Sequence, residues 1–425
     1  MAERISTLVY ATAASSWLYR AEGGSAIVFG FAGSPDNPLS TCVLRVRKVV
    51  RGSVGGGASA RPPPSVAAGA CARVRLSRAP APWLSELASA LARSDASRPA
   101  ARSRADALDA DALEVQEDAA MLPRTAHVPA HAQWAVEIKP KAVASRVGGA
   151  DGVCRFCARA VVHALDESTA ARAALHVDAA SSDMEERARV GGGAAAVSDN
   201  DLTIEAAQLV SLYCPADLYS GDVTRARAAL GALSVRPRNN LRAWRGGHVW
   251  HDAPPDALLS ALAALLCGPH SPLPPLRAVQ EAGDAAVGGD EAGALEVLLA
   301  AESGNADADA RLDDYLRGAT AKDASIVVAL AWEEDAADSD TTATAGSLMT
   351  EEDKLELQSL RSVHVTDVGG RRVVFSFAVV DWEAKDRKRV RKWVAAAERD
   401  ARVWKMSGPI ILERAGKSCA LRLLT

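Results

Sequence analysis

The chain is organised around Tyr315–Leu330, which reads Tyr-Leu-Arg-Gly-Ala-Thr-Ala-Lys-Asp-Ala-Ser-Ile-Val-Val-Ala-Leu. This pattern predicts the end of a helix, a charged pair formed by Lys322 and Asp323, and then a strand. Because the strand is apolar and unbroken from Ile326, it is expected to be buried on both faces. A carboxylate held at the lip of a buried strand suits a general base that acts on a hydroxyl, or the electrostatic centre of a phosphoryl transfer. A solvated turn containing Lys-Asp would give the same pattern.

The composition is that of a soluble globular protein. The 425 residues exceed what one ordinary core holds, so two lobes or domains are expected. Charged residues make up 24% of the chain and hydrophobic residues 48%, which are ordinary values. The formal net charge of −4 argues against a general nucleic-acid binder, although it leaves local basic patches open.

The sequence also bears on the compartment. No basic segment leads into an apolar one after Met1, so no signal peptide is expected. The longest apolar run, Ala257–Cys267, is too short to span a bilayer, so no membrane association is expected. Seven scattered cysteines, an odd number, indicate a reducing environment. The expected location is therefore the cytoplasm, the nucleus or both.

A glycine turn followed by a basic strand is predicted near the N-terminus. Trp17–Phe31 contains Gly23 and Gly24 between two apolar runs, and Thr41–Lys48 alternates apolar and basic residues around Arg45. Kinases use this plan, because glycines let backbone N–H groups approach phosphates and a cation on the next strand pairs with them. The two glycines also fit an ordinary hairpin turn.

A second charged strand is predicted at Trp134–Lys141. Alternation along a strand puts Glu137, Lys139 and Lys141 on one face, although Pro140 marks the end of the strand. Three charges on an otherwise apolar strand are costly unless they face a polar cleft. They could also lie on the solvent side of an edge strand.

A third element ends in an acid. Val373–Asp381 reads as a long apolar strand that ends in aspartate, which is where a kinase keeps a magnesium ligand. The similar-looking Asp367 precedes Gly369 and Gly370, so its segment is expected to be a hairpin turn. The basic run Lys385–Trp393 fits either a solvated helix face or a surface for an anionic ligand, and a helix would put Lys385 and Arg389 one turn apart.

A pair of cysteines raises the question of zinc. Cys154 and Cys157 form a C-x-x-C, and His163 and Cys214 could complete a site. The spacing is loose and no second C-x-x-C exists, so small residues on a buried helix face explain the pattern better. Structural zinc is therefore not expected.

Five segments in the same order resemble the inositol-pentakisphosphate 2-kinases, the enzymes that make phytate. They are Glu22-Gly-Gly24, Glu137-Ile-Lys-Pro-Lys141, Asn239-Asn-Leu-Arg242, Thr320-Ala-Lys-Asp323, and Asp381 with Lys385. The resemblance implies a two-lobed, kinase-like α+β fold. Residues 1–140 would form a smaller N-lobe with an antiparallel sheet, and residues 141–425 a larger C-lobe with inositide-binding insertions.

The resemblance also implies an activity: transfer of a phosphoryl group from ATP, with Mg²⁺, to the 2-hydroxyl of inositol 1,3,4,5,6-pentakisphosphate, giving inositol hexakisphosphate. Catalysis would use Asp323 as the base and Lys139 on the transferring phosphate, with Asp381 holding Mg²⁺. The nucleotide would contact Glu22, Gly23, Gly24, Arg45, Glu117, Asp118 and Glu137, the acidic pair at 117 and 118 forming the hinge. The inositide would contact Lys141, Asn239, Asn240, Arg242, Lys385, Arg389 and Trp393.

The chain departs from the family's pattern at several positions. Ala26 stands where plant members have an asparagine, Cys157 where they have a substrate-binding lysine, and Trp393 where they have a tyrosine. The family also has a substrate arginine upstream of the hinge. Arg98, Arg102 and Arg104 all remain candidates for it.

The basic residues of the chain are consistent with a highly negative inositide ligand. Five phosphates carry about −8 to −10 in total, at roughly −1.5 to −2 each. A net-acidic protein can bind them only through a concentrated basic patch, for which the chain offers Lys139, Lys141, Arg242, Lys385 and Arg389. The expected partners are ATP and inositol pentakisphosphate, with no nucleic acid, and the expected state is a monomer.

Two other functions remain open. Ala26 and the altered hinge would suit a non-catalytic inositol-polyphosphate-binding scaffold, although intact Asp323 and Asp381 argue against it. Nucleic-acid binding through residues 385–392 is weaker, because interleaved aromatics are limited to Trp382 and Trp393.

Overall fold

The computed structural model describes residues 2–22, 26–34, 37–49, 73–93, 107–123, 126, 128–142, 146–147, 153–182, 208–289, 291–337, 361–382 and 384–414. By internal contacts these fall into two compact units. The first unit comprises Met1–Ile138, Arg242–Asp252 and Ser325–Asp381; the second comprises Lys139–Leu241, Ala253–Ala324 and Trp382–Thr425. Grouping by contacts does not test a lobe boundary at residue 140, which stays a prediction. The fold is of the mixed α+β class, as expected.

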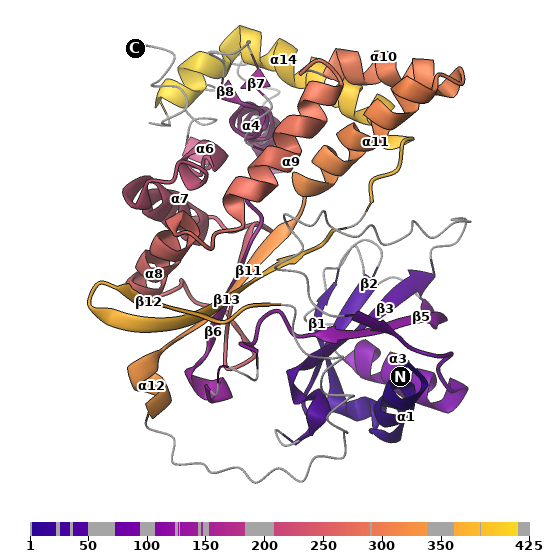
Figure 1. Cartoon of the computed structure of the whole chain (residues 1–425). Helices are drawn as coiled ribbons and strands as arrows, with labels where there is room; N and C mark the ends of the chain where they lie inside the picture. The colour runs from indigo at the N-terminus through magenta and orange to yellow at the C-terminus, as the bar shows by residue number, and fades with distance from the viewer. Residues whose placement is uncertain are drawn as a thin grey trace. The chain divides into compact units, whose positions relative to one another are not determined.

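One antiparallel sheet of the first unit comes from the N-terminal residues (Figure 1). Its strands, in sheet order, are β1 (Trp17–Glu22), β2 (Ala26–Phe31), β3 (Cys42–Val49), β5 (Ala107–Glu117) and β4 (Arg73–Arg75). Their apolar side chains share a core with the helices α1 (Ala2–Ala11) and α3 (Ala81–Arg93). Trp17, Phe29, Leu44 and Leu87 are fully buried in it, so burial of the alternating apolar residues fixes this sheet.

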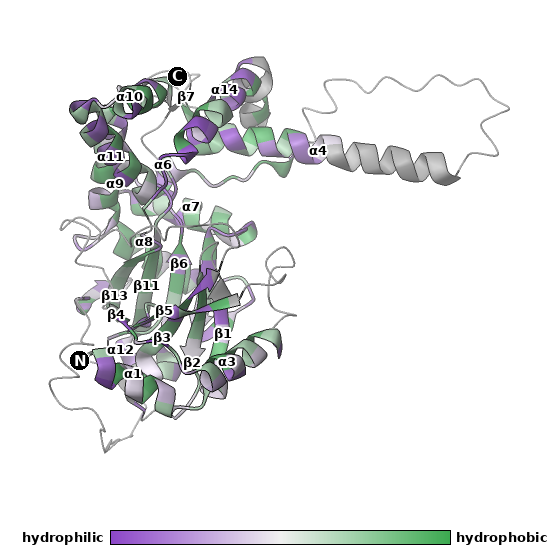
Figure 2. Ribbon diagram, turned by 90° about the vertical axis from the view of Figure 1, so that its right-hand side faces the viewer, coloured by the Kyte–Doolittle hydropathy of each residue, from purple (hydrophilic) through white to green (hydrophobic). Residues whose placement is uncertain are grey.

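The second sheet of this unit is built around the organising stretch. Its order is β10 (His248–Trp250), β9 (Leu241–Arg245), β6 (Trp134–Ile138), β11 (Ser325–Trp332), β13 (Arg371–Val380) and β12 (His364–Val368). All eight residues of β11 are buried, which confirms the predicted strand. Figure 2 shows β6 and β11 largely in the hydrophobic colour. A short helix, α12 (Glu333–Ala337), follows β11.

The hairpin between β12 and β13 confirms a smaller prediction. Its turn is formed by Gly369 and Gly370, with φ of 61° and 80°, values that a two-residue hairpin turn requires. Asp367 lies on exposed β12 in front of this turn. Asp381, by contrast, directly follows the long buried strand β13.

The second unit is mainly helical. It contains α4 (Arg155–Ser182), α6 (Pro215–Leu218), α7 (Val223–Val235), α8 (Asp256–Cys267), α9 (Leu273–Ala286), α10 (Glu291–Glu302), α11 (Ala306–Ala321) and α14 (Arg389–Arg414). A small ribbon of β7 (Arg146–Val147) and β8 (Val153–Cys154) precedes α4. Among the described residues, no helix combines the length and apolar character that crossing a membrane requires.

The crossing of α9 and α11 sets where Asp323 lies. A Cβ atom added to Gly318 would come within 2.8 Å of the Cα of Gly283, so the two backbones touch at this point. After the crossing, α11 ends at Ala321, and the backbone N–H of Asp323 donates to the carbonyl of Thr320 at 3.1 Å. A rigid helix end therefore carries Asp323.

The basic run does not form one continuous helix. Residues 384–386 have no regular structure, and α14 begins at Arg389. The side chain of Asp386 accepts from the backbone N–H of Lys388 at 2.9 Å, as side chains at a helix start do. The condition under which Lys385 and Arg389 would lie one helical turn apart, a helix through both, is therefore not met.

Candidate active site

Three predicted lysines converge on Asp323 within the second unit. Lys385 donates from Nζ to Oδ2 of Asp323 at 2.6 Å, and Nζ of Lys141 lies 3.6 Å from Oδ1. Burial favours the neutral form of Asp323. The hydrogen bond and charge of Lys385, with the charges of Lys141 and Lys139, outweigh it and hold the pKa of Asp323 below its ordinary value. An ionised, half-exposed carboxylate beside cations can accept a proton and stand next to a phosphorylated ligand.

The lysine next in sequence to Asp323 is not its partner. Lys322 forms an ion pair with Asp284 of α9, and burial lowers the pKa of Lys322 while Asp284 opposes that shift. The side chains of Lys322 and Asp323 therefore serve different purposes: the first fastens α11 to α9, and the second meets lysines from distant segments.

The segment Lys139–Lys141 is fixed at every residue. The N–H of Lys139 donates to the carbonyl of Asn240 at 2.9 Å, and the carbonyl of Pro140 accepts from the hydroxyl of Tyr213 at 2.7 Å. The carbonyl of Lys141 accepts from Nε2 of Gln280 at 3.3 Å. These contacts hold a backbone that would otherwise be free after the end of β6.

The backbone of this segment brings the lysines to Asp323. Its path differs from the predicted strand. Strand β6 ends at Ile138, so alternation does not place Glu137, Lys139 and Lys141 on one strand face. Instead Lys141 adopts a φ of 66°, which a non-glycine residue keeps only when its surroundings enforce it. Burial lowers the pKa of Lys141, and the neighbouring Lys139 and Lys385 add to that shift, whereas Asp323 opposes it.

A second group of side chains lies in the first unit, at one end of three adjacent strands. Ser325 opens β11, and its hydroxyl lies 2.8 Å from Oε1 of Glu137 on β6 and 3.1 Å from Oδ2 of Asp381, which follows β13. Asp381 has a φ of 60°, so it also sits in a backbone conformation that few residues adopt. Carboxylate and hydroxyl oxygens are ligands that Mg²⁺ accepts, so these residues fit a magnesium site.

The same three chain segments supply both groups. Glu137 lies two residues before Lys139, Asp323 two residues before Ser325, and Asp381 four residues before Lys385. Sequence reasoning singled out most of these residues. It missed Ser325, although one polar residue at the start of an otherwise apolar strand was a visible signal.

The predicted hinge carboxylates are both engaged by arginines inside the first unit. Glu117 accepts from Nη2 of Arg361 at 2.7 Å, and Asp118 forms an ion pair with Arg20. Arg361 is fully buried and also donates to the backbone carbonyls of Asp118, Ala119 and Met121. Arg361 therefore fixes the hinge backbone. Sequence reasoning missed it because nothing marks a single arginine that lies 244 residues from Glu117.

A comparison with known protein families finds one family that matches this chain. A model of the inositol-pentakisphosphate 2-kinase family matches residues 19–400, a range that contains the hinge and both carboxylate groups. The chain belongs to the inositol-pentakisphosphate 2-kinase family. The resemblance read from the five motifs is thus confirmed, and with it a two-lobed kinase-like fold and a phosphotransferase of inositol phosphate metabolism. A search of curated proteins finds no match.

Other predicted nucleotide contacts of this kinase are only partly described. Gly23 and Gly24 lie outside the described residues, as does the side chain of Glu22 at the end of β1. Arg45 lies on β3, as expected, and its guanidinium pairs with Glu114 of β5 at 3.5 Å. The three candidate arginines upstream of the hinge, Arg98, Arg102 and Arg104, also lie outside the described residues.

The Asn-Asn-Leu-Arg motif of the kinase forms a turn into β9. The N–H of Asn240 donates to the carbonyl of Pro237 at 2.8 Å, and the side chain of Asn240 is buried. Asn239 and Arg242 are exposed. Through its backbone bond to Lys139, the turn supports the lysine segment, and a direct contact of its side chains with inositide stays a prediction.

The basic run of the kinase divides into two kinds of residue. Arg387 pairs with Asp309 and Asp313 of α11, and Arg391 pairs with Glu302 of α10. Arg389 is exposed at the start of α14. Trp393 packs edge-on against Tyr315 with ring centroids 6.2 Å apart, and its carbonyl accepts from Arg155. Part of the run therefore fastens α14 to the helices beside it.

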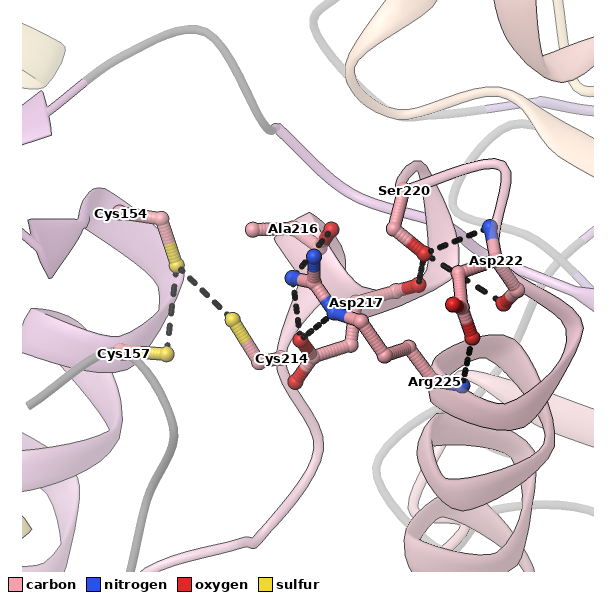
Figure 3. Close-up of polar contacts among 8 residues, drawn as sticks. All are labelled: Cys154, Cys157, Cys214, Ala216, Asp217, Ser220, Asp222 and Arg225. Atoms are coloured by element: carbon pink, nitrogen blue, oxygen red, sulfur yellow. Dashed lines mark hydrogen bonds and ion pairs between the residues drawn. The ribbon is translucent and has the colours of Figure 1, made fainter. Parts of the chain in front are cut away.

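Three thiols gather elsewhere in the second unit (Figure 3). Sγ of Cys154 lies 3.2 Å from Sγ of Cys157 and 4.0 Å from Sγ of Cys214, and all three residues are buried. They come from the end of β8, the first turn of α4 and the residue before α6. The thiols gather despite their loose spacing, because the chain before α6 returns to α4, and this group fits poorly with the expectation of no structural zinc. His163 is exposed on α4 and is not part of the group.

Proposed function

We propose that this kinase transfers the γ-phosphoryl group of ATP to the 2-hydroxyl of inositol 1,3,4,5,6-pentakisphosphate and so produces inositol hexakisphosphate. The observation that carries the proposal is the ionised carboxylate of Asp323, with Lys385 at 2.6 Å and Lys141 at 3.6 Å. A base needs to be near the hydroxyl it serves, and a ligand with about five phosphates needs cations at the same place. The family match supports this activity in general terms.

Asp323 is proposed to accept the proton of the 2-hydroxyl as the new P–O bond forms and the bond between the γ-phosphorus and the β,γ-bridging oxygen breaks, which releases ADP. Because its pKa is depressed, it is ionised at neutral pH and is only a weak base. Positioning and charge therefore contribute most of the catalysis, as is usual in phosphoryl transfer. Lys385 and Lys141 would exchange part of their interaction with Asp323 for charge-assisted bonds to phosphate oxygens. Lys139 would neutralise the transferring group.

The magnesium site of the proposal consists of Asp381 and Glu137. Their carboxylate oxygens are hard ligands at the ends of neighbouring strands, and the hydroxyl of Ser325 contacts both carboxylates. A bound Mg²⁺ would neutralise charge on the nucleotide phosphates. The resemblance implies that Glu137 lies near the nucleotide, and a Mg²⁺ ion held by Glu137 and bound to the nucleotide phosphates would agree with that role.

The three thiols are proposed to hold a structural zinc ion. Sulfurs around a tetrahedral Zn²⁺ lie about 3.8 Å apart when each Zn–S bond is about 2.3 Å. The separations of 3.2 and 4.0 Å bracket that value. Zinc content measured by mass spectrometry should fall in Cys214→Ser and stay unchanged in Cys267→Ser, a free thiol on α8 outside the group. Equal zinc in both variants, or none in the wild type, would contradict this part.

A non-catalytic inositide scaffold remains the second candidate, because both hinge carboxylates are already engaged by Arg361 and Arg20. One experiment separates the two. The purified protein is incubated with ATP, Mg²⁺ and inositol pentakisphosphate, and the inositol phosphates are resolved by ion-exchange chromatography. A hexakisphosphate product supports the kinase, whereas tight inositide binding without product supports the scaffold.

We also propose a monomer in the cytoplasm, the nucleus or both.

A further inference from the structure

The hydroxyl of Ser325 lies between two carboxylates on neighbouring strands. Strand β11 pairs with β6 on one side and with β13 on the other, so the first residue of β11 has the end of each neighbour beside it. Ser325 is fully buried, and its Oγ lies 2.8 Å from Glu137 and 3.1 Å from Asp381. Each partner comes from a different strand. The hydroxyl is therefore a direct link between the two acids.

The number of protons makes this arrangement unusual. A serine hydroxyl has one proton to donate, whereas an ionised carboxylate only accepts. Ser325 can serve Glu137 or Asp381 at a given moment, but not both. Two like charges are also held near one oxygen atom, where they repel each other. A divalent cation shared by the two carboxylates relieves that repulsion and leaves the hydroxyl to orient them.

The backbone of Asp381 adds a second observation. Its φ of 60° is a left-handed conformation that aspartate tolerates better than most residues but does not prefer. Such a conformation persists where surrounding contacts enforce it. One such contact joins Oδ2 of Asp381 to the Ser325 hydroxyl, which also contacts Glu137 of strand β6.

We propose that Ser325 is a positioning residue that holds Asp381 and Glu137 so that both carboxylates bind one divalent cation. The inference rests on the proposed function in assigning a metal to Asp381. It goes further by giving Ser325 a role, since its hydroxyl holds the two carboxylates in place before the ion binds. Preorganisation by rigid strands is what gives such a site affinity, because the ion then meets ligands that are already in place.

The main test measures metal binding directly, with Mn²⁺ alone as the probe. Electron paramagnetic resonance counts free Mn²⁺ during titration of the whole protein, with and without a non-hydrolysable ATP analogue. Loss of a contact that orients a metal ligand commonly lowers metal affinity about 10- to 100-fold. Ser325→Ala is expected to show a loss of that size, and Ser325→Thr, which keeps the hydroxyl, is expected to retain most of the affinity.

Ser376 provides a matched control. It is also a fully buried serine of the same sheet, on β13, but its hydroxyl has no hydrogen-bond partner among the described residues. Ser376→Ala is expected to bind Mn²⁺ as the wild type does. A loss equal to that of Ser325→Ala would assign the effect to general disturbance of the sheet and would overturn the proposal.

A third variant keeps the test decisive even when Ser325→Ala folds poorly, which thermal melting would reveal. Glu137→Gln keeps the shape of the side chain and removes its charge, so it is expected to weaken Mn²⁺ binding about as much as Ser325→Ala. Unchanged Mn²⁺ affinity in Glu137→Gln would overturn the two-carboxylate site. A wild type that binds no Mn²⁺ in either condition would do the same.

Steady-state kinetics then separates this inference from the proposed function. In Ser325→Ala the Mg²⁺ concentration for half-maximal activity is expected to rise about 10- to 100-fold, with much of the rate recovered at saturating Mg²⁺. A merely structural role would lower the rate at every Mg²⁺ concentration. If the wild type binds Mn²⁺ through these residues but forms no hexakisphosphate, the proposed function fails and the metal site stands.

Discussion

Asp323 and Glu117 are both carboxylates held by cations, yet they differ in burial and in the kind of cation. Asp323 is 52% exposed and faces the ammonium groups of Lys385 and Lys141. Glu117 is 8% exposed and faces Arg361, which is fully buried. An ammonium group is a mobile point charge, whereas a buried guanidinium is a rigid fork that fixes several acceptors at once. Lysine ammonium groups around a half-exposed acid therefore suit an exchangeable ligand, whereas a buried arginine on a buried acid suits a permanent structural contact.

The largest effect is expected from a substitution of Asp323, the half-exposed carboxylate. Asp323→Asn should lower the rate of phosphoryl transfer about 10²- to 10⁴-fold, because the base is lost while the lysines remain. Inositide binding should be largely retained. Single-turnover kinetics and calorimetry measure the two quantities, and Asp367→Asn, on exposed β12, is the control. Turnover at the wild-type rate would remove Asp323 from the mechanism.

The buried group is tested by stability rather than by rate. Arg361→Met should cost about 3–5 kcal/mol of unfolding free energy, because the charge of Glu117 stays buried after its partner is removed. Denaturant unfolding measures this loss. Arg372→Met is the matched control, since Arg372 pairs with Glu333 at 2.9 Å but is 60% exposed. That variant should lose less than about 1 kcal/mol. Similar losses in the two variants would show that burial does not set the contribution of these ion pairs to stability.

A smaller effect is expected from the lysines. Lys385→Met should weaken inositol pentakisphosphate binding about tenfold or more, because a charge-assisted bond contributes about 1.5–3 kcal/mol. The loss should be greater at low salt, and ATP affinity should change little. Arg391→Met is the control, because its partner is Glu302. Calorimetric titrations of both ligands decide the outcome, and unchanged inositide affinity in Lys385→Met would return that residue to a structural role.

The smallest effect is one of pH. The pKa of Asp323 is lower when folded than the ordinary value of 3.8, so its ionised form stabilises the folded state above that value. This contribution is lost as pH falls through the lowered pKa, and it is small because the group is half exposed. The acidic limb of the pH–rate profile should lie below the ordinary carboxyl range. Lys385→Met should move it upward, and an unmoved limb would show that another group titrates there.

The local sequence pattern was enough to predict the two strands next to Asp323 and Asp381. The unbroken apolar run after Asp323 predicted β11, and the apolar run before Asp381 predicted the end of β13. Both depend on burial over a few consecutive residues. The sequence also predicts the lysines near Asp323, but strand alternation does not explain them, because Lys141 reaches Asp323 through a left-handed backbone conformation.

What the sequence could not show depends on contacts between distant residues. Arg361 meets the hinge across more than two hundred residues, and Cys214 meets Cys154 across sixty. No spacing rule covers such separations, because the intervening chain sets them. The pairing of Arg387 with α11 likewise could not be told from an open basic surface by charge alone.

The glycine crossing of α9 and α11 has a consequence for how this chain can vary. Gly283 and Gly318 each lie where a Cβ atom would strike the other's backbone, at 2.7 and 2.8 Å. Neither position can therefore accept any other residue while its partner stays in place, and changing both only doubles the collision. In a complete mutational scan, we expect both positions to tolerate no other residue. Substitution is therefore excluded at both positions. The close helix crossing that positions Asp323 depends on two residues that have no Cβ atom.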